Sequence, residues 1–192
     1  PTVRMYVDVK DNSGNVVTNL SPNMFFVSEK KVSSGDFQSV TIKNISMLDE
    51  KEALNINMVA DTSSSMEGER LSSAKNVMST FLNTVQFNVG DKVKLTEFNS
   101  YIDKTGVFTS DKNALNQKIF SYFASGQTKL YDTLIYAVQD VSGIPGAKCV
   151  LAFTDGDDVG SYNSVYDVIN VVSAYKIPVY IVRIGDSYSA ND

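Results

Sequence analysis

The 192-residue chain contains no histidine. This absence excludes a Ser-His-Asp triad, a Cys-His catalytic pair and any metal site that depends on imidazole ligands. There is a single cysteine, Cys149, so no disulfide can form within the chain. Cys149 opens an apolar run that continues through residues 150–153, and we expect a small core side chain there rather than a nucleophile.

Long apolar runs and clusters of positive charge are also missing. No apolar stretch approaches the roughly 20 residues of a membrane-spanning helix, and we expect no secretory signal peptide within these 192 residues, which says little about where a parent protein is located. The net charge is −5 and the lysines are scattered, which argues against binding to nucleic acid. The chain begins at Pro1 rather than Met, so we expect a processed product or an excised piece of a larger protein.

Residues 1–48 carry the signals of short strands. Apolar residues alternate with polar ones over 3–9, a turn cluster follows at 11–15, and short apolar runs occupy 24–27 and 40–42. Fewer than about fifty residues with a modest apolar content rarely fold alone. We therefore expect this β-rich segment to pack against another surface.

From residue 54 to residue 192, strand-like runs alternate with amphipathic helical stripes. The predicted strands are 54–61, 92–99, 149–153 and 178–184. The predicted helices are 70–87, a helix that Asp111 caps and that reaches residue 123, 130–141 and 163–175. A short antiparallel edge strand is expected over 102–109. This order predicts an α/β fold with a Rossmann-like, doubly wound, mostly parallel sheet and helices on both faces.

Oxygen-bearing side chains gather where the predicted strands end. The run 61–65, Asp-Thr-Ser-Ser-Ser, ends the first strand of this region, and 154–158, Thr-Asp-Gly-Asp-Asp, follows the strand 149–153. A Gly-Gln-Thr loop at 126–128 precedes a helix. Ligands of open α/β sheets collect at the carboxyl ends of strands, and oxygen ligands suit a hard divalent cation better than zinc or copper. Taken alone, 61–65 is also typical of an ordinary helix cap.

At these residues the chain resembles the von Willebrand factor A family and its metal-ion-dependent adhesion site. The family pattern is Asp-x-Ser-x-Ser, a distant Thr and a later Asp, and the corresponding residues are Asp61, Ser63, Ser65, Thr128 and Asp155. The resemblance covers residues 54–185. The family fold usually continues with another helix and strand, so we expect either that these are absent or that the segment 3–9 occupies part of their space.

The resemblance implies a bound Mg²⁺, with Mn²⁺ or Ca²⁺ as alternatives. Ser63 and Ser65 would ligate the metal directly, and Thr128 directly or through water. Asp61 and Asp155 would act directly or through water and balance the charge. Because few carboxylates bind directly, the metal would remain electrophilic and could accept a Glu or Asp carboxylate from a protein partner.

Four further side chains are candidates for contact with that partner because they lie on loops at or near the metal face: Tyr101, Tyr131, Asp157 and Tyr162. The alternatives are packing of the tyrosines against loop backbone and a solvated acidic loop around Asp157. Asp132 is expected to belong to the first turn of a helix rather than to the metal shell.

The leading hypothesis for the function is a non-enzymatic, metal-dependent, adhesion-type binding module that is secreted or at the cell surface. A second hypothesis is a cytoplasmic subunit of a chelatase-like or transport assembly that contacts an ATPase. A third is a haloacid-dehalogenase-like phosphatase with Asp61 as its nucleophile. Such enzymes need a second Asp two residues further on, where this chain has Ser63.

Overall fold

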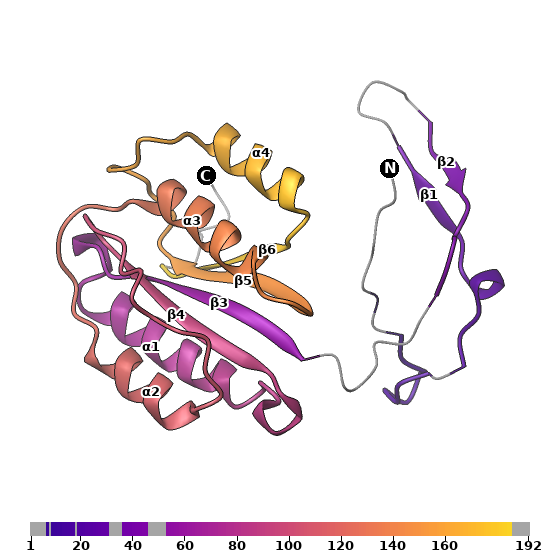
Figure 1. Ribbon diagram of the computed structural model, residues 1–192, viewed down its shortest axis with the longest axis horizontal. Helices are drawn as coiled ribbons and strands as arrows, with labels where there is room; N and C mark the ends of the chain where they lie inside the picture. Colours follow the sequence, from indigo (N-terminus) through magenta and orange to yellow (C-terminus); the bar gives the residue numbers. More distant parts are fainter. Residues whose placement is uncertain (1–6, 8, 18, 31–35, 46–52, 186–192) are drawn as a thin grey trace. The chain divides into compact units, whose positions relative to one another are not determined.

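The computed structural model describes residues 7, 9–17, 19–30, 36–45 and 53–185, which belong to two compact units, Pro1–Asp49 and Glu50–Asp192 (Figure 1). The first unit contains a 3₁₀ turn, η1 (Pro22–Met24), and two strands, β1 (Val27–Glu29) and β2 (Gln38–Val40). These strands pair antiparallel in a sheet of their own. None of the described residues of this unit is buried, so they form no core among themselves.

The predictions for this unit are partly wrong. The turn at 11–15 is confirmed, because the Asp11 carboxylate accepts hydrogen bonds from the backbone N–H groups of Ser13 and Asn15. The predicted strand at 24–27 is wrong, since Pro22 starts a 3₁₀ turn and the strand begins only at Val27. The strand predicted at 40–42 begins and ends two residues earlier in the sequence, as β2 (Gln38–Val40). Most of the alternating segment 3–9 lies outside the described residues.

The second unit is built on a four-stranded parallel sheet. Its strands lie in the order β4 (Lys92–Phe98), β3 (Leu54–Asp61), β5 (Ala147–Thr154) and β6 (Val179–Arg183). This confirms the predicted α/β fold with a mostly parallel sheet. The chain first adds β4 on one side of β3 and later β5 on the other, so the point where the strand order reverses lies between β3 and β5.

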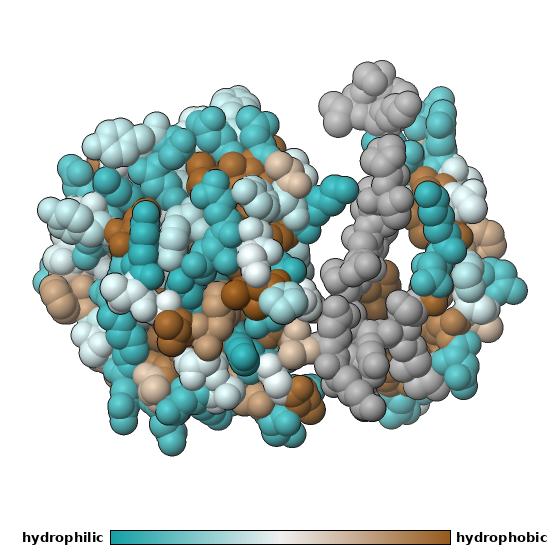
Figure 2. All heavy atoms as spheres, in the orientation of Figure 1, coloured by the Kyte–Doolittle hydropathy of each residue, from teal (hydrophilic) through white to brown (hydrophobic). Residues whose placement is uncertain are grey.

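Two helices cover each face of this sheet (Figure 1). One face packs against α1 (Glu69–Leu82) and α2 (Lys112–Ser121), and the other against α3 (Leu130–Ser142) and α4 (Val165–Tyr175). Side chains of β3 alternate between the two cores, with Met58 in the first and Val59 in the second. On the face shown in Figure 2, apolar residues of this unit are scattered among polar ones.

Three local features differ from the predicted boundaries. Helix α1 ends at Leu82, and a separate 3₁₀ turn, η3, follows it (Phe87–Val89). Helix α2 is capped by Asp111 as predicted, but it ends at Ser121. The backbone of Tyr122 is extended, so its ring is buried while Phe123, which was expected on the apolar stripe, is exposed.

The predicted antiparallel edge strand over 102–109 is reduced to two isolated bridges with β4, Val93 to Thr109 and Phe98 to Ile102. The segment passes very close to the backbone of β4 at Gly106. A Cβ atom at this position would lie 2.5 Å from the carbonyl oxygen of Leu95, so only glycine fits there. The segment therefore runs antiparallel beside β4 and pairs with it near both ends of that strand, without forming a continuous ladder.

Cys149 is partly buried and packs against the core under α1 and α2. Burial raises the pKa of its thiol to about 11, so it is protonated at neutral pH, as expected for a structural cysteine. Among the described residues, no helix combines the length and the apolar composition needed to cross a bilayer.

A buried polar network joins the sheet to α3. The Lys94 ammonium donates to Asp140 Oδ1 at 2.8 Å and to the Tyr136 hydroxyl at 3.0 Å. The amide of Asn57 donates to Asp140 Oδ2 at 3.1 Å and accepts from the Thr96 hydroxyl at 2.8 Å. Asp140 thus supplies the anion for the buried Lys94 ammonium and an acceptor for the amide N–H of Asn57.

Replacing Asp140 with alanine should destabilise the protein by about 2–4 kcal/mol, because it leaves the buried Lys94 ammonium without its anion. Urea unfolding measures the loss. The apolar double variant Lys94→Met, Asp140→Leu should lose less than the single variant. A loss of less than about 0.5 kcal/mol in Asp140→Ala would contradict a structural role for the network.

Candidate metal centre at the carboxyl ends of β3 and β5

The predicted metal site starts from the parallel pairing of β3 and β5. Ala60 lies opposite Phe153, so the residues that follow, Asp61 and Thr154, lie at the same edge of the sheet. The Thr154 hydroxyl donates a hydrogen bond to Asp61 Oδ2 at 2.6 Å. Asp61 is only 1% exposed, and the pairing of the two strands therefore fixes a buried carboxylate at this edge.

The turn after β3 gathers the two predicted serine ligands around this carboxylate. The backbone N–H of Ser63 donates to Asp61 Oδ1 at 2.9 Å, and the hydroxyl oxygens of Ser63 and Ser65 lie 3.0 Å apart. Ser65 lies within a 3₁₀ turn, η2 (Ser64–Met66), and α1 begins only after Gly68. Neither η2 nor α1 has a side-chain cap. The interpretation of 61–65 as an ordinary helix cap is therefore wrong.

The loop that carries Thr128 is attached to the same turn by its backbone. Ser125 donates its N–H to the carbonyl of Thr62 at 2.8 Å, and Ser64 donates its N–H to the carbonyl of Gly126 at 3.0 Å. Gly126 has φ +77°, and a Cβ atom there would meet the Ser100 hydroxyl oxygen at 2.6 Å. Thr128 is buried at this edge.

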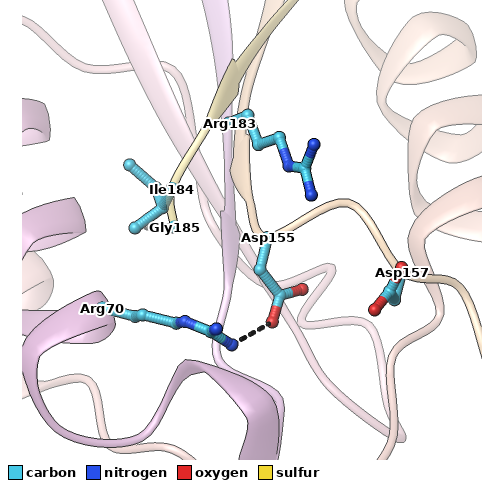
Figure 3. Close-up of a pocket in the computed structure, with 6 residues that line it drawn as sticks. All are labelled: Arg70, Asp155, Asp157, Arg183, Ile184 and Gly185. Carbon is cyan, nitrogen blue, oxygen red and sulfur yellow. Dashed lines mark hydrogen bonds and ion pairs between the residues drawn. The ribbon is translucent and has the colours of Figure 1, made fainter. Parts of the chain in front are cut away.

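Asp155 follows β5 and is the second buried carboxylate of the site (Figure 3). Its Oδ2 lies 3.5 Å from Nη1 of Arg70. Its Oδ1 is buried and accepts no hydrogen bond within the described structure. A buried carboxylate oxygen without a donor is costly, and a cation is one way to satisfy it.

The electrostatics of the site favour a cation. Burial is the largest cause that raises the pKa of Asp61, and the nearby Asp155 charge raises it further, while hydrogen bonds from Ser63 and Thr154 act in the opposite direction. A divalent cation would offset the cost of placing two carboxylates close together in a buried position. The residues present therefore fit a hard cation with oxygen ligands.

The ligand set is rich in hydroxyls and poor in carboxylates. Within the described parts of the chain, no group of three or more His, Cys, Asp or Glu side chains is arranged to hold a metal ion. What the structure does bring to one edge is the five-residue set predicted from the sequence: Asp61, Ser63, Ser65, Thr128 and Asp155. Such a set resembles sites in which Mg²⁺ keeps several of its waters.

The four candidates for partner contact fall into two groups. Tyr101 and Tyr162 are 82% and 92% exposed, and Asp157 is exposed beside Asp155 (Figure 3). Tyr131 is partly buried against the apolar core under α3. The prediction that Tyr131 lies on a loop is therefore wrong, because it is the second residue of α3 (Leu130–Ser142).

Two acids that were not predicted to shape the site hold the loop between β5 and α4. Asp132 lies in the first turn of α3, as expected, and it accepts hydrogen bonds from the backbone N–H groups of Tyr162 and Asn163. Asp158 accepts from the N–H of Tyr131 at 3.1 Å and from the Ser161 hydroxyl at 2.7 Å. Together they fasten the loop that carries Tyr162 to the start of α3.

The family model of the von Willebrand factor type A domain matches residues 56–157, which is more than half of the chain. The chain belongs to this family. The matched range contains all five residues of the predicted metal site.

Solved structures share the fold of this von Willebrand factor type A domain. An aerotolerance-related membrane protein from Bacteroides fragilis matches with a TM-score of 0.59 and 18% identity, over 73% of this chain and 75% of that one. The vWF domain of the type V pili tip protein Mfa5 from Porphyromonas gingivalis matches with a TM-score of 0.51 and 24% identity. That match covers 55% of this chain but only 38% of the Mfa5 domain, and 20% of a longer Mfa5 structure. No curated protein matches the chain.

The hydrogen bonds that Asp132 accepts from Tyr162 and Asn163, which we call the Asp132 clamp, give a prediction for pH dependence. Burial alone would raise the pKa of this carboxyl, but hydrogen bonds from Tyr162 and Asn163 outweigh it and hold the pKa below the ordinary 3.8. Its contribution to loop stability is therefore present above the ordinary value and is lost as the pH falls through the lower one. In an NMR titration, the amide signals of Tyr162 and Asn163 should change with a midpoint below 3.8. A midpoint at or above that value would contradict the clamp.

Proposed function

We propose that this domain is a non-enzymatic binding module whose site holds a divalent cation, Mg²⁺ in the first instance with Mn²⁺ or Ca²⁺ as alternatives, and accepts a carboxylate from a protein partner. The observation that carries the proposal is the buried Oδ1 of Asp155, an acceptor without a donor among the described residues, beside a second buried carboxylate and two converging hydroxyls. When bound, the cation supplies a Lewis acid to which the acidic side chain of the partner can bind.

The residues of the site have separate roles in this proposal. Ser63 and Ser65 offer neutral oxygens, and Thr128 adds a third from the neighbouring loop. Asp61 holds the turn after β3 in place, because its two oxygens accept from the Ser63 N–H and from the Thr154 hydroxyl. Asp155 supplies the free oxygen. With only two carboxylates of its own, such a site leaves charge on the cation for a ligand from outside.

The comparisons support a role in surface adhesion. The family includes a domain of a protein named as the tip protein of a type V pilus, and one structural neighbour is named as a membrane protein. These names suit a location in secreted or cell-surface proteins better than a chelatase-like assembly in the cytoplasm. Tyr101 and Tyr162 follow β4 and β5 in the chain, and their exposed rings suit contacts with a protein partner.

The phosphatase alternative fits the geometry less well. Its nucleophile would be Asp61, yet both oxygens of this carboxylate already accept hydrogen bonds and the side chain is buried. The position where those enzymes carry a second Asp holds Ser63, which cannot act as a general acid in the same way. A binding module needs neither a nucleophile nor a general acid.

Metal binding is tested by calorimetric titration of the purified chain with Mn²⁺ and Mg²⁺. The wild-type protein should bind one ion, and its unfolding temperature should rise with the metal concentration, because only the folded state forms the site. Asp155→Ala should lower the affinity by about 10–100-fold or more, since it removes the free oxygen. EDTA should reverse the thermal shift.

The control for this titration is Glu67→Gln, which removes an exposed acid close to Ser65 in the sequence without touching the site. Its affinity for Mn²⁺ should remain within about threefold of wild type, as expected for a screened surface charge. Equal losses in the two variants would show that general negative charge, and not the proposed ligands, attracts the ion.

Acceptance of a carboxylate is tested with N-acetylglutamate as the probe. On the Mn²⁺-loaded protein, its carboxylate should displace water from the ion and lower the enhancement of water-proton relaxation. N-acetylglutamine, which lacks the side-chain acid, should have the smaller effect. If both compounds leave the relaxation unchanged at millimolar concentration, the ion does not accept an external carboxylate and the adhesion-type role fails.

A further inference from the structure

Arg70 connects the two turns that carry the predicted ligands. It lies in the first turn of α1, and its Nη1 is 3.1 Å from the carbonyl oxygen of Ser65 and 3.5 Å from Oδ2 of Asp155 (Figure 3). The arginine side chain is 41% exposed, whereas that of Asp155 is 7% exposed. A partly solvated cation therefore lies against a buried anion of the site.

The two oxygens of Asp155 have different surroundings. Oδ2 faces the guanidinium of Arg70, and Oδ1 is buried and accepts no hydrogen bond from the described residues. The carboxylate can thus be shared, with one oxygen on the arginine and the other available to a second cation. The arginine and a metal ion at Oδ1 would act on the same negative charge.

This sharing changes the charge of the site. Asp61 and Asp155 are its two carboxylates, and the guanidinium offsets one of them. A positive charge close to a cation site weakens cation binding by Coulomb repulsion and strengthens the attraction of the loaded site for an anion. The effect is largest at low ionic strength and where burial limits screening.

We propose that Arg70 sets the balance between the two binding steps: it weakens the hold of the site on its own divalent cation and strengthens the binding of an anionic carboxylate to the loaded site. Arg70 acts through Asp155, whose Oδ2 faces its guanidinium, and does not itself bind the metal ion or the carboxylate. The inference rests on the function proposed above, because it requires a divalent cation at Asp155.

The experiment titrates Mn²⁺ alone into the wild-type chain and into Arg70→Gln and Arg70→Lys. Arg70→Gln keeps hydrogen-bonding capacity but removes the charge, and it should bind Mn²⁺ about 3–10-fold more tightly at low ionic strength. Arg70→Lys keeps the charge and should remain within about twofold of wild type. The gain in Arg70→Gln should shrink when salt is raised to about 0.5 M, because salt screens the repulsion.

The second readout is carboxylate binding at saturating Mn²⁺. In the water-relaxation assay, Arg70→Gln should bind N-acetylglutamate about threefold or more weakly than wild type, so the two affinities move in opposite directions. A residue that only supports the fold would weaken both. Thermal unfolding without metal verifies that each variant is folded, which the exposed position of the Arg70 side chain favours.

The matched control is Lys129→Gln. It removes the same charge next to Thr128, but from a side chain whose ammonium lies 4.9 Å from the ring centre of Tyr162 rather than against Asp155. Its affinity for Mn²⁺ should change less than that of Arg70→Gln. Equal gains in the two variants would overturn the inference, because the effect would then come from general surface charge.

Two other outcomes separate the inference from the proposed function. If the wild-type chain binds Mn²⁺ and Arg70→Gln binds it no more tightly, the inference is wrong while the metal site stands. If Arg70→Gln binds Mn²⁺ more weakly, the inference is also wrong, and the main role of Arg70 is to hold the Ser65 carbonyl through its hydrogen bond. If the wild-type chain binds no Mn²⁺, the proposed function is wrong and the inference fails with it.

Discussion

The hydrogen bond from the Thr154 hydroxyl to Asp61 Oδ2 is the contact on which the rest of the site depends. It joins the ends of two neighbouring parallel strands at the point where the strand order reverses. It also holds the buried carboxylate of Asp61 in place. The second oxygen of Asp61 orders the turn after β3 through the Ser63 N–H. Both oxygens of Asp61 are engaged, so Asp61 works mainly as a scaffold. Asp155 is the other buried acid of the site, and its Oδ1 accepts no hydrogen bond from the part of the chain that the structure describes.

The cost of this arrangement is electrostatic. Two acids lie close together in buried positions at the edge of the sheet, and burial makes the charged form of Asp61 unfavourable. The chain meets this cost in part with neutral hydroxyls in place of further acids and with one guanidinium against Asp155. The remainder can be met by an external cation. A site that is only partly compensated by the protein is suited to reversible binding, which is what an adhesion module needs.

Much of the sheet follows from local sequence, while the connections do not. Strand β3 agrees with its predicted range because a buried parallel strand shows as an apolar run that ends at a polar turn. The ends of α1 and α2 differ because capping geometry, and not periodicity, stops a helix. The contact between Arg70 and Asp155 joins residues 85 apart in sequence, and it depends on how the start of α1 is placed beside the loop that follows β5. No local pattern carries that information.

The docking of the Thr128 loop has a consequence for how this domain can diversify. Its two attachments to the turn after β3 are made between backbone groups, so they do not depend on which side chains the loop carries. Gly126 is the exception, because its positive φ and its approach to Ser100 admit no side chain. Apart from Gly126 and the proposed ligand Thr128, mutations in this loop can therefore alter the surface offered to a partner while the frame of the proposed metal site is retained. In this domain, the side chains of the loop and the backbone contacts that hold it in place are therefore separable.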